Sequence, residues 1–192
     1  KYYYEKEFKK IESVKARIGT SNYSKDYRPL QSTSNAQALG PGARYEIDAT
    51  IADIYLVSNS NPESIVGRPT IYFVIDVFSR LVAGFYIGFE SPSYLAAIQA
   101  LNIAMTDKVK YCAEYGISIQ PEDWPAVGLP DALLADRGEL LGYQIEALEK
   151  TFAVRLENAP ARRGDAKGIV EQAFNTYQAY FKKEGKGKGV VE

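Results

Sequence analysis

Four acidic residues stand beside apolar stretches of this sequence, where freely solvated side chains are not expected. They are Asp48 in YEIDAT, Asp76 in VIDVFSR, Asp136 in LLADRGE and Glu171 in KGIVEQAF. A buried carboxylate is costly unless it is paired or bound to a metal ion. Carboxylates that converge repel one another, and divalent cations hold such groups ionised together. The pattern therefore indicates a candidate metal site assembled from distant parts of the chain.

Each of these acids also has a purely structural interpretation. Asp48 lies inside an expected strand, where a cross-strand arginine or an edge position would explain it. Asp136 follows an expected strand end, where Asp commonly begins a turn, and Glu171 in the first turn of a helix would complement the helix dipole. Asp76 precedes a Ser-Arg turn and is expected to tie a hairpin together. Asp76 is therefore assigned to structure, and both interpretations stay open for the other three.

The residue types exclude several kinds of chemistry. The chain has no histidine and a single cysteine, Cys112, so a Cys/His zinc site, a Ser-His-Asp triad and an intramolecular disulfide are excluded. Cys112 lies in a helical pattern and is expected to be a small buried hydrophobe. Ligands made only of oxygen favour Mg²⁺ or Mn²⁺. Two such ions, about 4 Å apart, would suit displacement at a phosphodiester.

Composition and charge are consistent with this chemistry. A chain of 192 residues, 46% hydrophobic and 24% charged, is typical of one soluble globular domain, and no apolar run is long enough to span a membrane. Residues 1–30 and 155–188 each carry a net charge of +4, whereas residues 44–154 carry −8. Basic ends around an acidic middle fit carboxylates that hold cations beside a bound anion, although solvated charged helices would give the same pattern.

Periodicity predicts an α/β domain between two flanking segments. The expected order is strands over 44–57, 68–78 and 79–90, a helix over 91–116, a strand over 131–136, a short helix around YQIEALEKT, a strand over 152–158, and a helix in IVEQAFNTYQAYFKK. This order predicts a mixed five-stranded sheet, with three antiparallel strands and then two parallel ones, flanked by helices. Residues 1–43 are expected to form an N-terminal helix and a linker or arm, and residues 185–192 a C-terminal linker. The first residue, Lys1, suggests a fragment of a longer protein.

Together, these motifs resemble the catalytic core of DDE transposases and retroviral-type integrases, which have an RNase H-like fold. The resemblance runs from about Tyr45 to Phe181 and rests on YEIDAT, VIDVFSR, LVAGFYIGFE, LLADRGE and KGIVEQAF. GRPTIYFVIDVFSRLVAGFYIGFESPSYLAAIQAL looks most like TnsB-type transposases. The resemblance implies a DDE catalytic core over residues 44–184, in which Asp48, Asp136 and Glu171 bind two Mg²⁺ or Mn²⁺ ions and form the catalytic triad.

The resemblance also implies a function and partners. The function would be cleavage of DNA at transposon 3′ ends, followed by transfer of the 3′-OH to target DNA. Alternatives are an RNase H-like nuclease, a retroelement integrase and a catalytically silent scaffold for DNA assembly. Implied partners are DNA, a separate endonuclease subunit, an ATPase regulator and further copies of the chain assembled on DNA. The implied location is the bacterial cytoplasm, in association with the nucleoid and not with a membrane.

Several positions near the motifs concern DNA contact. The basic loop with Arg162, Arg163 and Lys167 is the candidate phosphate-binding segment, with a solvated surface loop as the alternative. Arg137 stands where many relatives have Asn, and would contact a phosphate or pair with one of the acids. Retroviral integrases have DNA-contacting lysines one and two turns after the Glu, where this chain has Asn175 and Gln178, so those contacts are not transferred.

Overall fold

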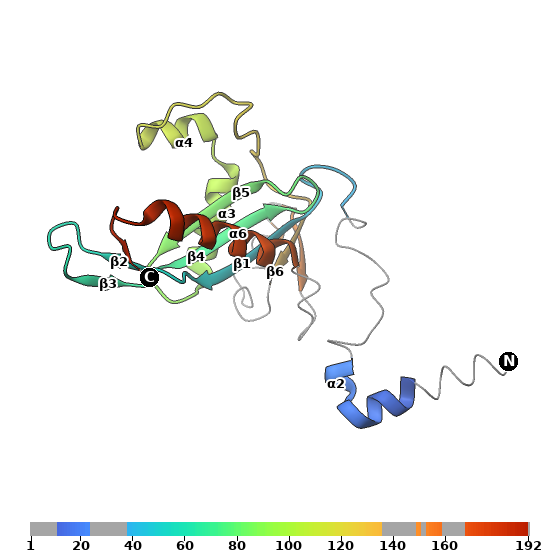
Figure 1. The fold of residues 1–192 in the computed structure, drawn as a ribbon. Helices are drawn as coiled ribbons and strands as arrows, with labels where there is room; N and C mark the ends of the chain where they lie inside the picture. Colours follow the sequence, from blue (N-terminus) through green and yellow to red (C-terminus); the bar gives the residue numbers. More distant parts are fainter. Residues whose placement is uncertain (1–10, 24–37, 136–148, 151–152, 159–167, 192) are drawn as a thin grey trace.

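A five-stranded mixed sheet forms the centre of the molecule (Figure 1). The computed structural model describes residues 11–23, 38–135, 149–150, 153–158 and 168–191. The sheet has the order β5-β4-β1-β6-β7, in which β1, β4 and β5 are antiparallel and β6 and β7 continue in parallel. Its strands are β1 (Tyr45–Ile51), β4 (Thr70–Asp76), β5 (Val82–Gly88), β6 (Ala132–Ala135) and β7 (Arg155–Asn158). The predicted five-stranded sheet is confirmed.

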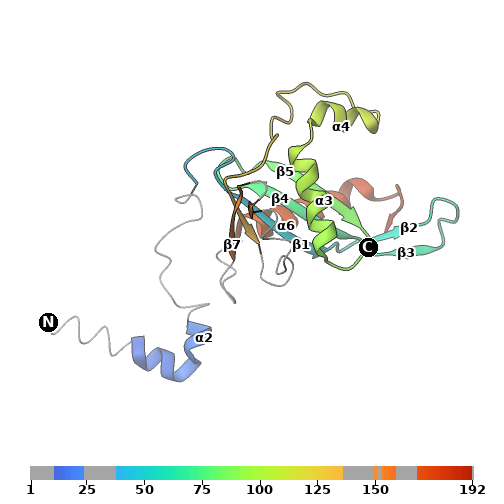
Figure 2. The same cartoon turned by 180° about the vertical axis from the view of Figure 1, so that it is seen from behind.

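Helices cover the two faces of this sheet. Helix α6 (Gly168–Gly185) lies across one face in Figure 1, and Figure 2 shows α3 (Tyr94–Met105) across the other. Tyr45 and Ile47 of β1 belong to the apolar core beneath α3. Because side chains alternate along a strand, Glu46 and Asp48 lie on the face that α6 covers. The apolar core on that second face contains residues of β4 and α6.

A second, three-stranded sheet corrects two predictions. It has the order β3-β2-β8, with β2 at Tyr55–Val57, β3 at Ile65–Gly67 and β8 at Val190–Val191. The single strand expected over 44–57 is therefore divided between two sheets. Within residues 185–192, expected to be a linker, β8 pairs with β2. Such short strands have no periodic signal of their own, and β8 forms because the fold brings it beside the distant β2.

The helix expected over residues 91–116 is also divided in two. Helix α3 ends at Met105, and α4 (Lys108–Glu114) begins two residues after the C-cap of α3. The Asp107 side chain caps α4 by accepting a hydrogen bond from the Lys110 N–H at 3.0 Å. Meanwhile, the buried Lys108 ammonium group donates to three backbone carbonyls at the end of α3. These side chains satisfy both helix ends, so that the chain can turn there.

Other expected elements are described in part. Residues 11–18 of the expected N-terminal helix are helical and are followed by the short α2 (Thr20–Asn22). The strand expected over 152–158 is β7, which begins at Arg155. Most of the helix expected around YQIEALEKT lies outside the described residues. Among the helices that the structure describes, none combines the length and the apolar character needed to cross a membrane.

Candidate catalytic site

Asp48 lies on the central strand of the main sheet. It is half-buried, on the face of β1 that α6 covers. Its antiparallel partner on β4 is Phe73, so an aromatic residue holds the directly opposite position. β1 has β4 on one side and β6 on the other, so it is not an edge strand. The strand therefore fixes this carboxylate at the centre of the main sheet.

Helix α6 brings Glu171 to the same level of the sheet. Phe73 stacks on Phe174 of α6, with ring centroids 5.2 Å apart. Because Phe73 is the strand partner of Asp48, this stack places the first turns of α6 over the middle of β1 and β4. Glu171 lies about one helical turn before Phe174 and is exposed. The carboxylates of Asp48 and Glu171 are thus carried by adjacent elements whose packing is fixed by a buried aromatic pair.

Two further contacts show that α6 runs in the same direction as β1. Near the start of the helix, the Val170 N–H donates to the Glu46 carboxylate at 3.3 Å. Farther along, the side-chain oxygen of Gln178 accepts from the Asp53 N–H at 2.9 Å. Asp53 follows the end of β1, so the helix and the strand advance together. Glu171 lies between these contacts.

The contact between α6 and Asp53 includes a small network of charged side chains. Lys182 lies 2.7 Å from one Asp53 carboxylate oxygen, and Arg68 lies 3.1 Å from the other. The hydrogen bond from Lys182, followed by its positive charge, lowers the pKa of Asp53. The Asp53 side chain is 65% exposed, so this network is a surface anchor for α6 and not a buried site.

Glu46 is a residue that the motif-based prediction missed. It is fully buried, at 0% exposure, and lies two residues before Asp48 on the same face of β1. The period-two alternation of a strand could have identified it, because that alternation places positions 46 and 48 on the same face. Its contact with the first turn of α6 makes it the described carboxylate that links β1 directly to the helix bearing Glu171.

Asp76 has the structural role predicted for it. It is buried, and its carboxylate accepts hydrogen bonds from the N–H and hydroxyl groups of Ser79 in the β4–β5 turn. The same carboxylate accepts from the Gly42 N–H at 3.1 Å, just before β1. Asp76 therefore ties the hairpin to the entry of the central strand. Arg80 has a positive φ of 67° in this turn.

The remaining predicted site residues lie outside the described part of the chain. These residues are Asp136, Arg137, Arg162, Arg163 and Lys167, and their assignments stay predictions. In sequence, Asp136 directly follows Ala135, the last residue of β6. Within the described ranges, no three or more Cys, Asp or Glu side chains form a group that could hold a metal ion.

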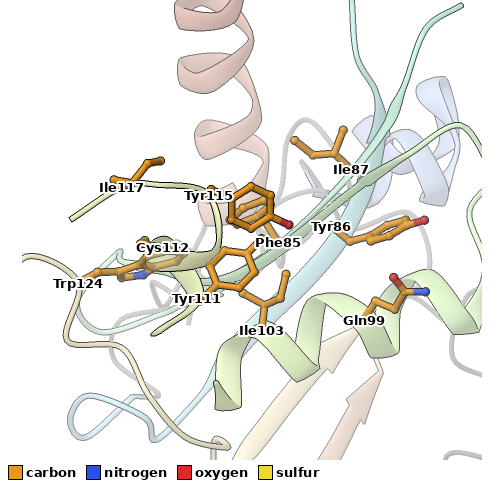
Figure 3. Close-up of a pocket in the computed structure, with 10 residues that line it drawn as sticks. All are labelled: Phe85, Tyr86, Ile87, Gln99, Ile103, Tyr111, Cys112, Tyr115, Ile117 and Trp124. Carbon is orange, nitrogen blue, oxygen red and sulfur yellow. The ribbon is translucent and has the colours of Figure 1, made fainter. Parts of the chain in front are cut away.

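A cavity elsewhere in the molecule does not belong to this site. It has a volume of about 540 Å³ and opens between β5, α3 and α4 (Figure 3). Aromatic and aliphatic side chains dominate its lining, and no carboxylate contributes to it: Phe85, Tyr86, Ile87, Gln99, Ile103, Tyr111, Cys112, Tyr115, Ile117 and Trp124. Cys112 is buried here, which confirms its prediction as a small core residue.

Known proteins similar to this chain point to one family. The family model described as the TnsB C-terminal domain matches residues 46–187. The transposon Tn7 transposition protein TnsB of Escherichia coli is 59% identical over 192 residues, which are 100% of this chain and 27% of that protein. The transposase for transposon Tn552 of Staphylococcus aureus is 22% identical over 164 residues, covering 85% of this chain and 31% of that protein. The chain thus spans about a third or less of these relatives.

One solved structure is similar to this chain in fold, at low sequence identity. It is a chain in the cryo-EM structure of the simian T-cell lymphotropic virus intasome with the PP2A regulatory subunit B56γ. The TM-score is 0.52 at 14% identity, and the match covers 81% of this chain and 46% of that chain. With the strand order of the main sheet, this confirms the predicted RNase H-like fold. The family match and the 59% identity show that the chain belongs to the TnsB C-terminal domain family.

Proposed function

We propose that this chain is the catalytic core of a DNA transposase that cleaves transposon 3′ ends and joins them to target DNA. The observation that carries the proposal is the placement of Asp48 and Glu171 by β1 and α6 on one face of the sheet. Its second support is the membership of the TnsB C-terminal domain family, which includes a relative named as a transposition protein.

Asp136 is proposed as the third ligand. The parallel pairing of β1 with β6 joins Tyr45 to Leu133 and Glu46 to Leu134. If this register continued for two more residues, position 136 would lie beside position 48, on the face toward α6. That continuation is part of the proposal, as is the division into an N-terminal segment over 1–43, a catalytic core over 44–184 and a C-terminal segment over 185–192.

The donor groups fit Mg²⁺ or Mn²⁺. The chain offers carboxylate oxygens and no histidine, and Asp48 is half-buried while Glu171 is exposed, so an ion could reach both from solvent. When bound, two ions would activate the attacking oxygen and stabilise the leaving 3′ oxygen. Asp48 would hold its oxygen ligands on the rigid central strand, and Glu171 would supply its own from the facing helix. No protein nucleophile is required, because water and then the freed 3′-OH attack the phosphodiesters directly.

The surroundings of the site are proposed to contact DNA. Arg162, Arg163 and Lys167 follow β7 and precede α6 in sequence, and Arg137 follows Asp136, so all four belong to segments that adjoin the proposed ligands. Positive side chains there would neutralise DNA phosphates. By resemblance, we also propose a separate endonuclease subunit, an ATPase regulator and assembly of several copies on DNA.

The test uses the full-length protein, a duplex carrying the transposon end, target DNA and Mg²⁺ or Mn²⁺. Asp48→Asn, Asp136→Asn and Glu171→Gln should each abolish 3′-end cleavage and joining. Glu184→Gln is the matched control, because Glu184 is also an exposed carboxylate on α6 but lies at its far end. Normal cleavage and joining by Asp48→Asn or Glu171→Gln would refute the proposal.

Other outcomes would identify the alternatives. Cleavage without joining, or a preference for RNA–DNA hybrids, would indicate an RNase H-like nuclease. Absence of Mn²⁺ binding in calorimetry, even with transposon-end DNA present, would indicate a scaffold that keeps the fold without the chemistry.

A further inference from the structure

Glu46 is a charged residue in a position where water cannot solvate it. The side chain is 0% exposed, although a buried carboxylate is costly unless the protein supplies polar partners. One of its carboxylate oxygens accepts a hydrogen bond from the Val170 N–H at 3.3 Å. These two residues are 124 positions apart in sequence, so the bond joins the central strand to the last long helix.

The position of Val170 explains why an acid suits this place. α6 begins at Gly168, so Val170 lies in the first turn, where backbone N–H groups have no partner within the helix. A carboxylate both accepts from such an N–H and complements the positive end of the helix dipole. A residue just before the helix commonly caps it, whereas here a side chain from β1 caps this N–H.

This contact connects the neighbours of two proposed metal ligands. Glu46 is two residues from Asp48 on the same face of β1, and Val170 immediately precedes Glu171 on α6. A shift of the first helical turn relative to β1 would therefore move Glu171 relative to Asp48. The anchor at Asp53 restrains a part of α6 about two turns farther along.

We infer that Glu46 is a positioning residue, which fixes the first turn of α6 on β1 and thereby sets the separation of Asp48 and Glu171. The inference rests on the proposed function for the metal site, but the contact itself does not. Because Glu46 is fully buried and bonded to the helix, its role is to orient and not to meet DNA. Divalent metal affinity depends on such orientation, and loss of an orienting partner commonly weakens it about 10- to 100-fold.

Three variants of Glu46 test separately the length, the charge and the volume of its side chain. Glu46→Gln keeps a side-chain oxygen at the same reach, so it should preserve the bond to the Val170 N–H. Glu46→Asp keeps the charge but shortens the side chain, and Glu46→Leu keeps much of the volume but removes the acceptor. Asp53→Ala is the matched control, because it removes the ion pairs with Lys182 and Arg68 at the other end of the α6–β1 contact and keeps the backbone N–H that Gln178 accepts.

The first readout needs no metal and no activity. In the full-length protein, hydrogen exchange in the first turn of α6, residues 168–172, should accelerate by about 10-fold or more in Glu46→Asp and Glu46→Leu, as lost protection of a bonded amide predicts. Glu46→Gln and Asp53→Ala should keep the wild-type rate there. Wild-type exchange in a folded Glu46→Asp or Glu46→Leu protein would refute the anchoring role.

The second readout is the Mn²⁺ concentration that gives half-maximal 3′-end cleavage, measured well below the unfolding temperature. It should rise about 10-fold or more in Glu46→Asp and Glu46→Leu. In Glu46→Gln and Asp53→Ala it should change little. Glu46→Asp keeps the test decisive if Glu46→Leu does not fold. An unchanged value in both, or an equal rise in Glu46→Gln, would refute the inference while Asp48→Asn and Glu171→Gln still test the function separately.

Discussion

Gly84 of β5 lies directly against the backbone of α3 at Ala100. A Cβ added to Gly84 would come within 2.2 Å of the Ala100 carbonyl oxygen and within 2.7 Å of the Ala104 nitrogen. Both neighbours are backbone atoms of a helix and cannot rotate aside. The helix and the strand therefore approach closely because this residue has no side chain.

Replacement of Gly84 by alanine should consequently destabilise the fold. We expect Gly84→Ala to lower the free energy of unfolding by about 1 to 3 kcal/mol, the usual cost of overpacking a core. Gly40→Ala is the control, because nothing lies within 4 Å of the Cβ that it would add. Urea denaturation followed by circular dichroism measures both. Equal stability of the two variants would show that α3 can shift away from β5 at little cost.

Asp76 and Asp48 are both strand carboxylates, yet their surroundings predict different effects of mutation. Asp76→Ala would leave the partly buried N–H donors of Gly42 and Ser79 without their acceptor. We expect it to lower the free energy of unfolding by about 2 to 4 kcal/mol, since each unsatisfied buried donor costs about 1 to 3 kcal/mol. Asp131→Ala, at an exposed position just before β6, should stay within about 0.5 kcal/mol of the wild type. A similar small loss in Asp76→Ala, seen in thermal and urea unfolding, would contradict the structural assignment.

Lys108 should make stability depend on pH in the alkaline range. Its ammonium group donates to the Ile103, Ala104 and Thr106 carbonyls and lies 5.1 Å from the centre of the Trp124 ring. Burial is the main cause that lowers the pKa of Lys108 to about 8, from 10.5. Below pH 8 both the folded and unfolded states carry the charge, and the folded state bears the full cost of burying it. Between pH 8 and 10.5 the unfolded state binds more protons, so stability rises with pH.

The measurement compares the wild type with Lys108→Met across this range. The difference between their free energies of unfolding should change in favour of the wild type by roughly 1 to 3 kcal/mol from pH 8 to 10.5, since one pKa unit corresponds to about 1.36 kcal/mol. Taking the difference removes the tyrosine titrations that both proteins share. A difference that stays constant with pH would mean that Lys108 titrates at its ordinary value.

The main sheet could be predicted from sequence because its strands are strongly apolar. All seven residues of β4 and all four of β6 are buried, and both segments stand out as continuous apolar runs. The small sheet could not be predicted in the same way. β3 and β8 have three and two residues and are partly exposed, so their pairing with β2 depends on where the larger elements place them.

The residues of the candidate site also differ in how well the sequence could predict them. Asp48 and Glu171 could be selected because each is an acid beside apolar residues within a predicted element. Strand alternation could have placed Glu46 on the same face as Asp48, but its contact could not be predicted, since the partner is a backbone N–H of Val170 and a backbone group has no signature in a sequence. The break between α3 and α4 had a readable signal in Asp107, an N-cap residue, but the apolar stripe continues past it and favoured a single helix.

Gln178 provides a last test, because the resemblance to retroviral integrases matches its position with a DNA-contacting lysine of those proteins. Here its side-chain oxygen accepts the Asp53 N–H at 2.9 Å, which gives it a structural role at the end of β1. Gln178→Ala should lower the free energy of unfolding by about 0.5 to 1.5 kcal/mol, the net value of one hydrogen bond. It should leave the affinity of the full-length protein for DNA, at fixed salt concentration, unchanged. Arg163→Ala, in the proposed phosphate-binding loop, should instead reduce the slope of log affinity against log salt by about 1. A clear loss of DNA affinity in Gln178→Ala, measured by fluorescence anisotropy with a labelled transposon-end duplex, would show that this face of α6 contacts DNA after all.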